Sequence, residues 1–225
     1  MDVHALNLMD AVRARHSVRS YLPKPIKAEK LAALRTLAEE CNREHDLHIQ
    51  LVTDEPKAFS SFLAHYGLFD NITNYIALVG KKRDGLDEAC GYCGEKLVIL
   101  AQALGLNTCW VALTYRKIPD AFEIGAGEAL VCVIALGYGK TQGKTRRSKS
   151  VKDVVEAGEH PDWFIRGAES ALLAPTAVNQ QKFRFLREGS CVKAVCGRGA
   201  CARIDLGIVK YHFELGAGTE NFEWM

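Results

Sequence analysis

The sequence has no long hydrophobic run, no strong charge of either sign and no glycine-rich dinucleotide motif. No stretch of the 225 residues approaches the roughly 20 apolar residues that a membrane-spanning helix needs, so no membrane partner is expected. The 29 basic residues nearly balance the 27 acidic ones, and a net charge of +2 gives no support to nucleic-acid binding. A Gly-x-Gly-x-x-Gly motif after a strand is also missing, which argues against a nicotinamide-binding Rossmann domain.

A secretory signal and a disulfide framework are not expected either. The first residues, MDVHALNLMDAVRARHS, mix acids and bases and contain no long apolar run. Eight cysteines without such a signal indicate reduced thiols, and we therefore expect a cytoplasmic location.

The cysteine spacing raises the alternative of a zinc or iron–sulfur site. Cys90 and Cys93 form a Cys-x-x-Cys pair, and three further cysteines follow at five-residue steps from Cys191. Cys93, however, enters an apolar helix, where cysteine behaves as a small hydrophobic residue. The later spacing fits no cluster motif, so no metal is expected.

What the sequence does contain is an ordinary globular composition, 48% hydrophobic and 25% charged. This is enough apolar material for a full core in one large domain or two small fused ones. Helical and strand patterns alternate along the chain, which favours a layered α+β fold over the alternative of a doubly wound sheet.

The expected elements follow from hydrophobic periodicity and from turn residues. Gly105 is expected to cap the C-terminus of a core helix that is apolar nearly all round. A polar, basic stretch at 137–150 is the one clear linker. Helices are expected at 7–15, 27–44, 56–64, 94–105, 162–173 and 203–215, and strands at 48–53, 75–80, 107–113, 129–139 and 183–186, with a strand or loop at 191–196.

The chain also contains an internal echo. Residues 31–54 and 167–189 both run from a helix through an asparagine to a strand, and 94–111 is echoed by 207–224. Chance similarity between amphipathic helices is the alternative explanation. If the echo is real, residues 1–140 form a first half, 141–150 a basic linker, and 151–225 a second, shorter half.

The first candidate site is RHSVR, just beyond the first helix. Arg15, Ser17 and Arg19 alternate, so all three side chains can face one side of an extended segment. Two guanidiniums and a hydroxyl suit a phosphate, because arginine offers paired donors to its oxygens. The alternative is a solvated basic turn. A second basic stretch, GKTRRSK at 143–149, is a solvated linker unless it folds back beside Arg15.

The second candidate site is PTAVNQQ, residues 175–181. Its hydroxyl, carboxamide and backbone groups match a flat heterocycle with imide and carbonyl edges better than they match a metal. A proline-terminated helix with polar capping residues is the alternative. That alternative explains Pro175 and Thr176, but it leaves the three amides unexplained.

The motifs RHSVR, APTAVNQQ, ALGLNTCWV and GKTRRSK together resemble those of the nitroreductase-like family of flavoproteins, over most of the chain. The resemblance implies a nitroreductase-like FMN-binding fold, with a central, mainly antiparallel sheet and flanking helices. Members are usually homodimers with FMN at the subunit interface. Here the PTAVNQQ segment, with Pro175, Thr176 and Asn179, lies some 140 residues later in the chain than its counterpart in the family. The chain thus looks like a dimer made within one polypeptide, similar to the branch called putative TM nitroreductases.

The resemblance implies one FMN site per chain, assembled from both halves of a possible monomer. Arg15 and Ser17 are expected at the phosphate and ribityl end, helped by Lys144, Arg146 or Arg147, and Arg19 at the pyrimidine edge. Thr176 and Asn179 are expected to hydrogen-bond the ring edge, with Pro175 packing nearby, and the backbone at 111–113 is expected near the flavin N5. His16 is either a weak phosphate donor or a surface imidazole. The candidate cofactor-binding residues are Arg15, His16, Ser17, Arg19, Val111, Ala112, Leu113, Lys144, Arg146, Arg147, Pro175, Thr176, Ala177, Asn179 and Gln181.

The activity that the resemblance implies is flavin-dependent reduction. NAD(P)H would be the co-substrate that supplies hydride to FMN, and a nitroaromatic, quinone or similar small molecule would be the electron acceptor. The flavin carries this chemistry, so no catalytic side chain is expected. A flavin-dependent enone or dehalogenating reductase, and an FMN-binding storage or sensor protein without turnover, are the alternatives.

Overall fold

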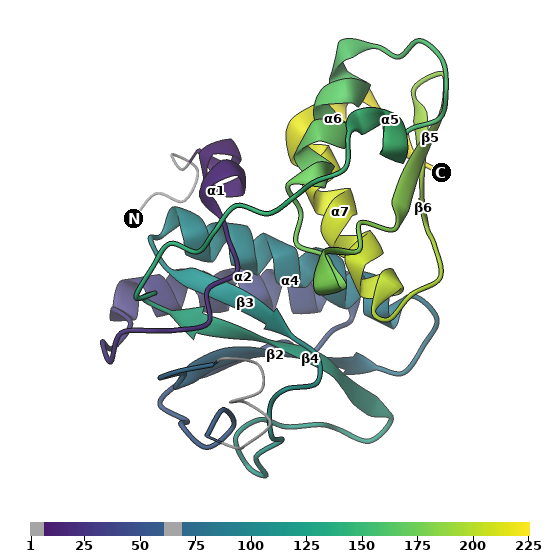
Figure 1. The fold of residues 1–225 in the computed structure, drawn as a ribbon. Helices are drawn as coiled ribbons and strands as arrows, with labels where there is room; N and C mark the ends of the chain where they lie inside the picture. Colours follow the sequence, from purple (N-terminus) through teal and green to yellow (C-terminus); the bar gives the residue numbers. More distant parts are fainter. Residues whose placement is uncertain (1–6, 61–68) are drawn as a thin grey trace.

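The computed structural model describes residues 7–60 and 69–225, which form two packed units (Figure 1). One unit is a four-stranded sheet with helices across one of its faces. The other contains three α-helices and a three-stranded sheet, and it stands on the first at one end of the sheet (Figure 1). The predicted α+β fold, mainly antiparallel, is confirmed.

The first unit is built on an antiparallel sheet in the order β1-β2-β4-β3. β2 is buried along nearly its whole length, because α2 and α4 cover one face and aromatic loop residues the other. α4 is buried on almost all sides, as its apolar sequence predicts. The elements are α1 (Leu8–Ala14), α2 (Ala28–His45), β1 (Gln50–Val52), β2 (Asn74–Lys81), α4 (Leu86–Ala103), β3 (Asn107–Val111) and β4 (Glu128–Gly137).

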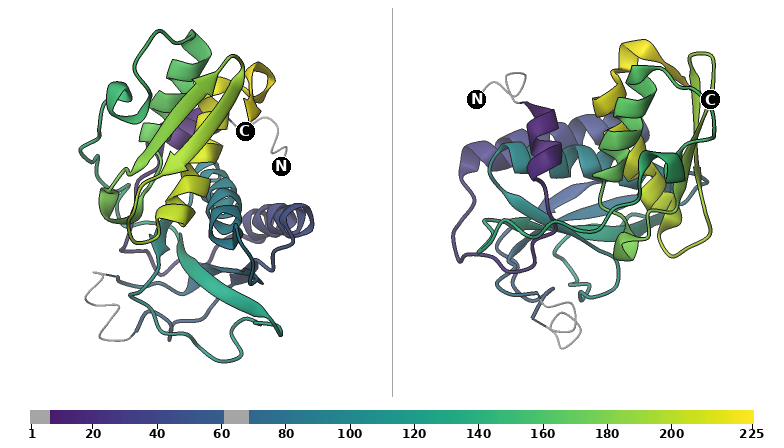
Figure 2. Two further views of the ribbon diagram at one scale, coloured as in Figure 1. Left: turned by 90° about the vertical axis from the view of Figure 1, so that its right-hand side faces the viewer. Right: turned by 45° about the horizontal axis from the view of Figure 1, so that its top comes forward.

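The second unit packs its helices onto α4. α7 crosses α4, α6 lies against α7, and the β5–β6 hairpin covers the outer side of these helices (Figure 2). An aromatic core that includes Phe164, Phe185 and Phe213 fills the space between them. The elements are α5 (Val151–Val154), α6 (Asp162–Leu172), η2 (Ala177–Asn179), β5 (Phe183–Glu188), β6 (Cys191–Cys196), α7 (Ala202–Ala217), η3 (Thr219–Asn221) and β7 (Glu223–Trp224).

Three details differ from the sequence prediction. The helix expected at 56–64 is a turn over 56–60, where the Glu55 carboxylate accepts the Lys57 and Ala58 amides, and its remaining residues lie outside the described part of the chain. α4 begins at Leu86 and not at Gly94, so both residues of the Cys-x-x-Cys pair lie inside the helix. The short helix α5 was not predicted; a capping box at Ser150 and Asp153 forms it.

The two sheets are related in a way that is compatible with the internal echo. β2 and β3 both run antiparallel to the β4 strand between them, whereas β6 and β7 are parallel neighbours with no strand between them. A second half that lacks a counterpart of β4 would have this arrangement. The asparagines of the echo differ, because Asn42 bonds Ile49 and Asn179 bonds Arg147. The duplication therefore stays a prediction.

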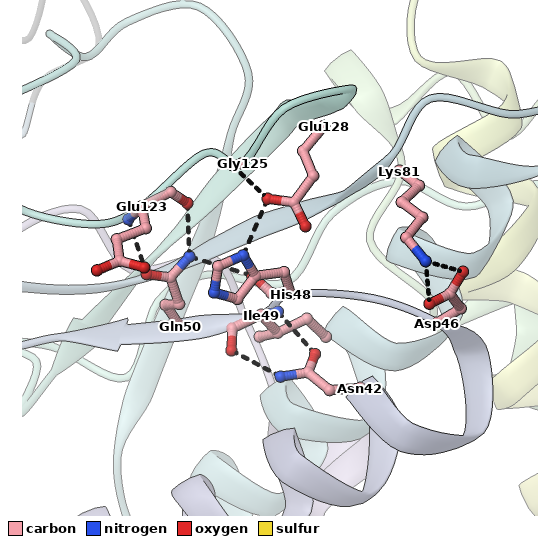
Figure 3. Close-up of polar contacts among 9 residues, drawn as sticks. All are labelled: Asn42, Asp46, His48, Ile49, Gln50, Lys81, Glu123, Gly125 and Glu128. Carbon is pink, nitrogen blue, oxygen red and sulfur yellow. Dashed lines mark hydrogen bonds and ion pairs between the residues drawn. The ribbon is translucent and has the colours of Figure 1, made fainter.

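A hollow of about 570 Å³ lies at the β1 edge of the sheet and contains none of the motif residues. Figure 3 shows polar contacts of this edge, including those of His48, Gly125 and Glu128, which line the hollow. His48 Nδ1 lies 2.9 Å from Glu128 Oε2, and the Gly125 amide donates to the same oxygen at 2.6 Å. The side chain of Asn42 bonds both the amide and the carbonyl of Ile49, which joins α2 to β1. These contacts fix the edge of the sheet.

The Glu128 contacts predict a stability that depends on pH. Hydrogen bonds from His48 and then from Gly125 lower the pKa of Glu128 below its ordinary 4.5. A lowered folded-state pKa contributes stability above the unfolded pKa, and this contribution is lost as the pH falls through the folded pKa. In urea unfolding from about pH 7 down to about pH 3, wild type should lose stability more steeply below pH 4.5 than Glu128→Gln. Glu123→Gln is the control, and equal slopes for wild type and Glu128→Gln would contradict the expectation.

No helix in the described residues is long and apolar enough to cross a membrane.

Candidate functional site

A cleft of about 370 Å³ lies where the two units meet. Its walls come from the segment after α1, the end of β3, the loop after α6 and the first turns of α7. Eight predicted site residues line it: Ser17, Arg19, Val111, Ala112, Leu113, Pro175, Thr176 and Ala177. Residues from both halves of one chain therefore share one cavity, whose size is typical of a small-molecule site.

The RHSVR segment reaches the cleft as an extended strand-like stretch. The Val18 amide donates to the Thr108 carbonyl at 3.0 Å, and Ser17 pairs with Thr108 in a parallel bridge beside β3. Val18 is buried, so its neighbours Ser17 and Arg19 turn toward the opposite side and line the cleft. Arg19 is exposed, and its side chain makes no hydrogen bond or ion pair with another described residue, whereas its carbonyl accepts the Asp70 amide.

The PTAVNQQ loop enters the cleft in a strained conformation. Val178, Asn179 and Gln181 all have positive φ, at 45°, 55° and 43°. Asp205, in the first turn of α7, holds this loop: its carboxylate accepts from the Ala177 amide at 2.9 Å and from Gln180 Nε2 at 2.7 Å. Val178 is 96% exposed at the mouth of the cleft, and a β-branched residue is disfavoured in this left-handed region.

The strain at Val178 predicts a stabilising substitution. Val178→Asn should raise the free energy of unfolding by about 1 kcal/mol, because asparagine tolerates the left-handed conformation. Leu113→Asn is the matched control, since Leu113 is also exposed but does not have positive φ. Urea unfolding of the three proteins measures the difference. If both variants shift stability equally, polarity and not backbone strain is responsible.

The three amides of the loop have structural partners. Asn179 Nδ2 donates to the Arg147 carbonyl at 2.8 Å. Gln181 is buried; its Oε1 accepts the Lys149 amide, and its Nε2 donates to Ser148 Oγ and the Leu172 carbonyl. Asn179 and Gln181 therefore tie the loop to the linker and do not line the cleft. Helix capping alone did not explain why the motif contains these amides; the structure shows that they hold the loop in place.

The basic linker folds back beside Arg15, as its functional interpretation requires. Arg15 Nη2 donates to the Leu173 carbonyl at 3.4 Å, and Arg146 Nη2 donates to the carbonyls of Leu172 and Ala174. Both guanidiniums thus meet the C-terminal end of α6. Burial, and then the charge of Arg15, lower the pKa of Arg146 to about 10. The two cations lie close enough to repel each other, which is the arrangement expected of an anion site.

The remaining predicted residues surround this pair of arginines. His16 is half-buried, and the linker passes directly against it at Gly143, whose φ is +81°. Burial, followed by the charges of Arg15 and Arg146, lowers the pKa of His16. The side chains of Lys144 and Arg147 are exposed. None of these residues lines the cleft itself.

Sequence reasoning missed a buried polar cluster behind the arginines. Glu95 on α4 lies at its centre, within reach of Arg15, Trp110 and His212, and all of its side chain is buried. Trp110 also lines the cleft. A glutamate directly before the apolar run of α4 was the available signal. Its partner His212 is 117 residues away, so only the tertiary structure brings the pair together.

Cysteines also line the cleft, at positions 109, 132 and 201. All eight cysteines of the chain are free thiols. Burial raises the pKa of the thiols at 109, 132 and 201, so these side chains are neutral wall residues near neutral pH. Within the described ranges, no group of three or more histidine, cysteine, aspartate or glutamate residues is placed to hold a metal ion.

The chain belongs to the family described as Putative TM nitroreductase, whose sequence model matches residues 7–217. Among solved structures, it is similar to a putative nitroreductase (tm1586) of Thermotoga maritima, with a TM-score of 0.66 and 23% identity over 95% of this chain and 84% of that one. No curated protein matches the sequence.

Two shorter structures show the same fold. A putative nitroreductase of Desulfovibrio desulfuricans in complex with FMN has a TM-score of 0.54 and 16% identity, over 68% of this chain and 98% of that one. A putative NADH dehydrogenase/NAD(P)H nitroreductase of Parabacteroides distasonis has a TM-score of 0.53 and 20% identity, over the same shares. The nitroreductase-like fold expected from the motifs is thereby confirmed.

Proposed function

We propose that the protein is an FMN-dependent oxidoreductase that takes hydride from NAD(P)H and delivers electrons to a small planar acceptor such as a nitroaromatic or a quinone. One observation carries the proposal: Ser17 and Arg19 of the first half and Pro175 and Thr176 of the second line one cleft within one chain. Family membership supports it, as do the FMN and NAD(P)H in the names of the two shorter structures.

The residues present fit FMN. Arg15 and Arg146 each use one nitrogen in hydrogen bonds, and Arg15 Nε is buried without a hydrogen-bond partner. A guanidinium has five N–H donors, so both arginines keep donors for phosphate oxygens. The apolar wall of the cleft, which includes Trp110 and Ile208, suits the faces of a flat ring.

Each predicted residue then has a place around the cofactor. Arg15 and Arg146 would hold the phosphate, with Lys144 and Arg147 adding positive charge around them and His16 offering a neutral ring N–H. Ser17 would bind the ribityl end, and Arg19 the pyrimidine edge, where a cation favours negative charge. Asn179 and Gln181 would act indirectly, because their amides hold the loop that presents the Pro175–Ala177 wall.

The chain's contribution to catalysis is binding, orientation and exclusion of water. When bound, FMN supplies the ring that accepts and donates electrons. The backbone at Val111, Ala112 and Leu113 would lie at the reactive edge of the ring, and the exposed side chains of Leu113 and Val178 would meet the acceptor. A single site per chain explains why the PTAVNQQ segment occurs only in the second half.

The test is anaerobic mixing of the FMN-loaded protein with NADH or NADPH. Loss of the flavin absorbance at catalytic rates, and its return on adding a nitroaromatic or a quinone, is the expected result. A flavin that binds but is reduced by neither nucleotide would overturn the enzymatic proposal and leave an FMN-binding storage or sensor protein. If only an enone or a halogenated ring reoxidises the reduced flavin, the protein is an enone or dehalogenating reductase and the proposed acceptor class is wrong.

A further inference from the structure

The cluster behind Arg15 joins four elements through one buried carboxylate. Glu95 Oε1 lies 2.8 Å from His212 Nε2 and 3.9 Å from Arg15 Nε, and Glu95 Oε2 accepts from Trp110 Nε1 at 2.9 Å. The other ring nitrogen of His212, Nδ1, lies 3.1 Å from the Ser170 carbonyl. Glu95 and His212 are fully buried and Arg15 nearly so. Water therefore plays little part in balancing these charges.

The hydrogen-bond partners determine where the protons lie. The Ser170 carbonyl can only accept, so His212 Nδ1 carries a proton. Every other neighbour of Glu95 is a donor, so a carboxyl proton would have no acceptor except His212 Nε2. One proton therefore lies between Glu95 Oε1 and His212 Nε2, and the pair as a whole carries no net charge.

This proton count leaves the charge of Arg15 uncancelled. Without this shared proton, Glu95 would neutralise Arg15. With it, Glu95 holds Arg15 in place while the cluster of three keeps one positive charge. Arg146 adds a second nearby, and its pKa is lowered first by burial and then by Arg15. Two positive charges match the roughly two negative charges of a phosphate monoester at neutral pH.

We propose that His212 and Glu95 are positioning residues of the FMN phosphate site: Glu95 orients Arg15 and Trp110, and His212 neutralises Glu95 so that Arg15 keeps its charge for the phosphate. The proposal rests on the proposed function, since it takes FMN as the ligand. If the pair had a purely structural role, its loss would weaken the binding of flavins with and without a phosphate equally.

The test is a cycle of glutamine substitutions. His212→Gln still donates an amide to Glu95 but removes the shared proton, so Glu95 cancels the charge of Arg15. Glu95→Gln can accept from Trp110 and donate to a neutral His212, and the cluster keeps its net charge. In the double variant Arg15 is again uncancelled. The affinity for FMN and for riboflavin, which lacks the phosphate, is measured by flavin fluorescence for all four proteins.

The expected result is that His212→Gln weakens FMN binding at least about tenfold, leaves riboflavin binding unchanged, and is rescued by Glu95→Gln. Rescue is the decisive observation. The double variant also lacks the bond to the Ser170 carbonyl, so a restored affinity for FMN can come only from the restored charge. His48→Gln is the matched control, since His48 also pairs with a glutamate but lies at the β1 edge.

Three outcomes contradict the proposal in distinguishable ways. If the double variant binds FMN no better than His212→Gln, the pair has only a structural role. If FMN and riboflavin weaken equally, the effect does not act on the phosphate. If the wild-type protein binds neither flavin, the proposed function fails, and this inference fails with it.

Discussion

Replacing Arg15 by glutamine is expected to weaken FMN binding about 100-fold and to leave riboflavin binding within about threefold. Arg15 is nearly fully buried, and its Nε has no hydrogen-bond partner among the described residues. A buried cation with unused donors interacts strongly with an anion, because little water screens the charge. Only the phosphate distinguishes the two flavins, so the ratio of their affinities isolates this interaction.

Arg13→Gln is the matched control for this experiment. Arg13 is two residues upstream, is exposed on α1 and pairs with Asp10, and it should leave both affinities unchanged. Thermal unfolding of Arg15→Gln must be measured as well, because the Leu173 carbonyl loses a donor. A proportional loss of FMN and riboflavin binding would mean that Arg15 only supports the fold.

The second large effect is expected at the crossing of α4 and α7. Gly207→Ala should lower the free energy of unfolding by about 3 kcal/mol, because the added Cβ meets backbone atoms that cannot move aside. It would lie 1.9 Å from the Glu88 carbonyl oxygen and 2.5 Å from the Tyr92 amide nitrogen. The helices would have to separate, which would also displace Glu95 from His212.

Urea unfolding measures this change, with Gly197→Ala as the control. A Cβ at Gly197 meets only the Lys182 side chain and carbonyl, at 3.5 Å and beyond, so its effect should be small. Gly91→Ala should resemble Gly207→Ala, since its Cβ would lie 2.1 Å from the Ile204 carbonyl oxygen. If the variants at Gly91 and Gly207 unfold at the wild-type midpoint, the described crossing of the helices is wrong.

The local patterns in the sequence were sufficient to predict most elements of the fold. Apolar periodicity located the core helices and strands, and Gly105 follows α4 with a φ of +72°, as its predicted capping role requires. The early start of α4 was missed; glycine is unfavourable inside helices, and Gly91 and Gly94 lie within this one. They stand where the Ile204 backbone and the Trp110 ring approach the helix, so the requirement for glycine is tertiary.

Only those residues of the candidate site that lie within short, contiguous motifs could be predicted from the sequence. Ser17, Arg19, Pro175 and Thr176 share the cleft because each belongs to a segment with a recognisable pattern. The roles of Asn179 and Gln181 were not predictable, since their partners lie on the linker. Glu95 and His212 were missed for the same reason, because a charge balance inside the core depends on neighbours distant in sequence.

The number of FMN molecules bound per chain tests the central claim most directly. The protein is loaded with FMN, its mass in solution is measured, and the flavin released on denaturation is counted against protein concentration. The account predicts one FMN per chain on a monomer, because one chain supplies both the RHSVR and the PTAVNQQ segments. Two FMN per chain, or no flavin even after adding FMN, would contradict it.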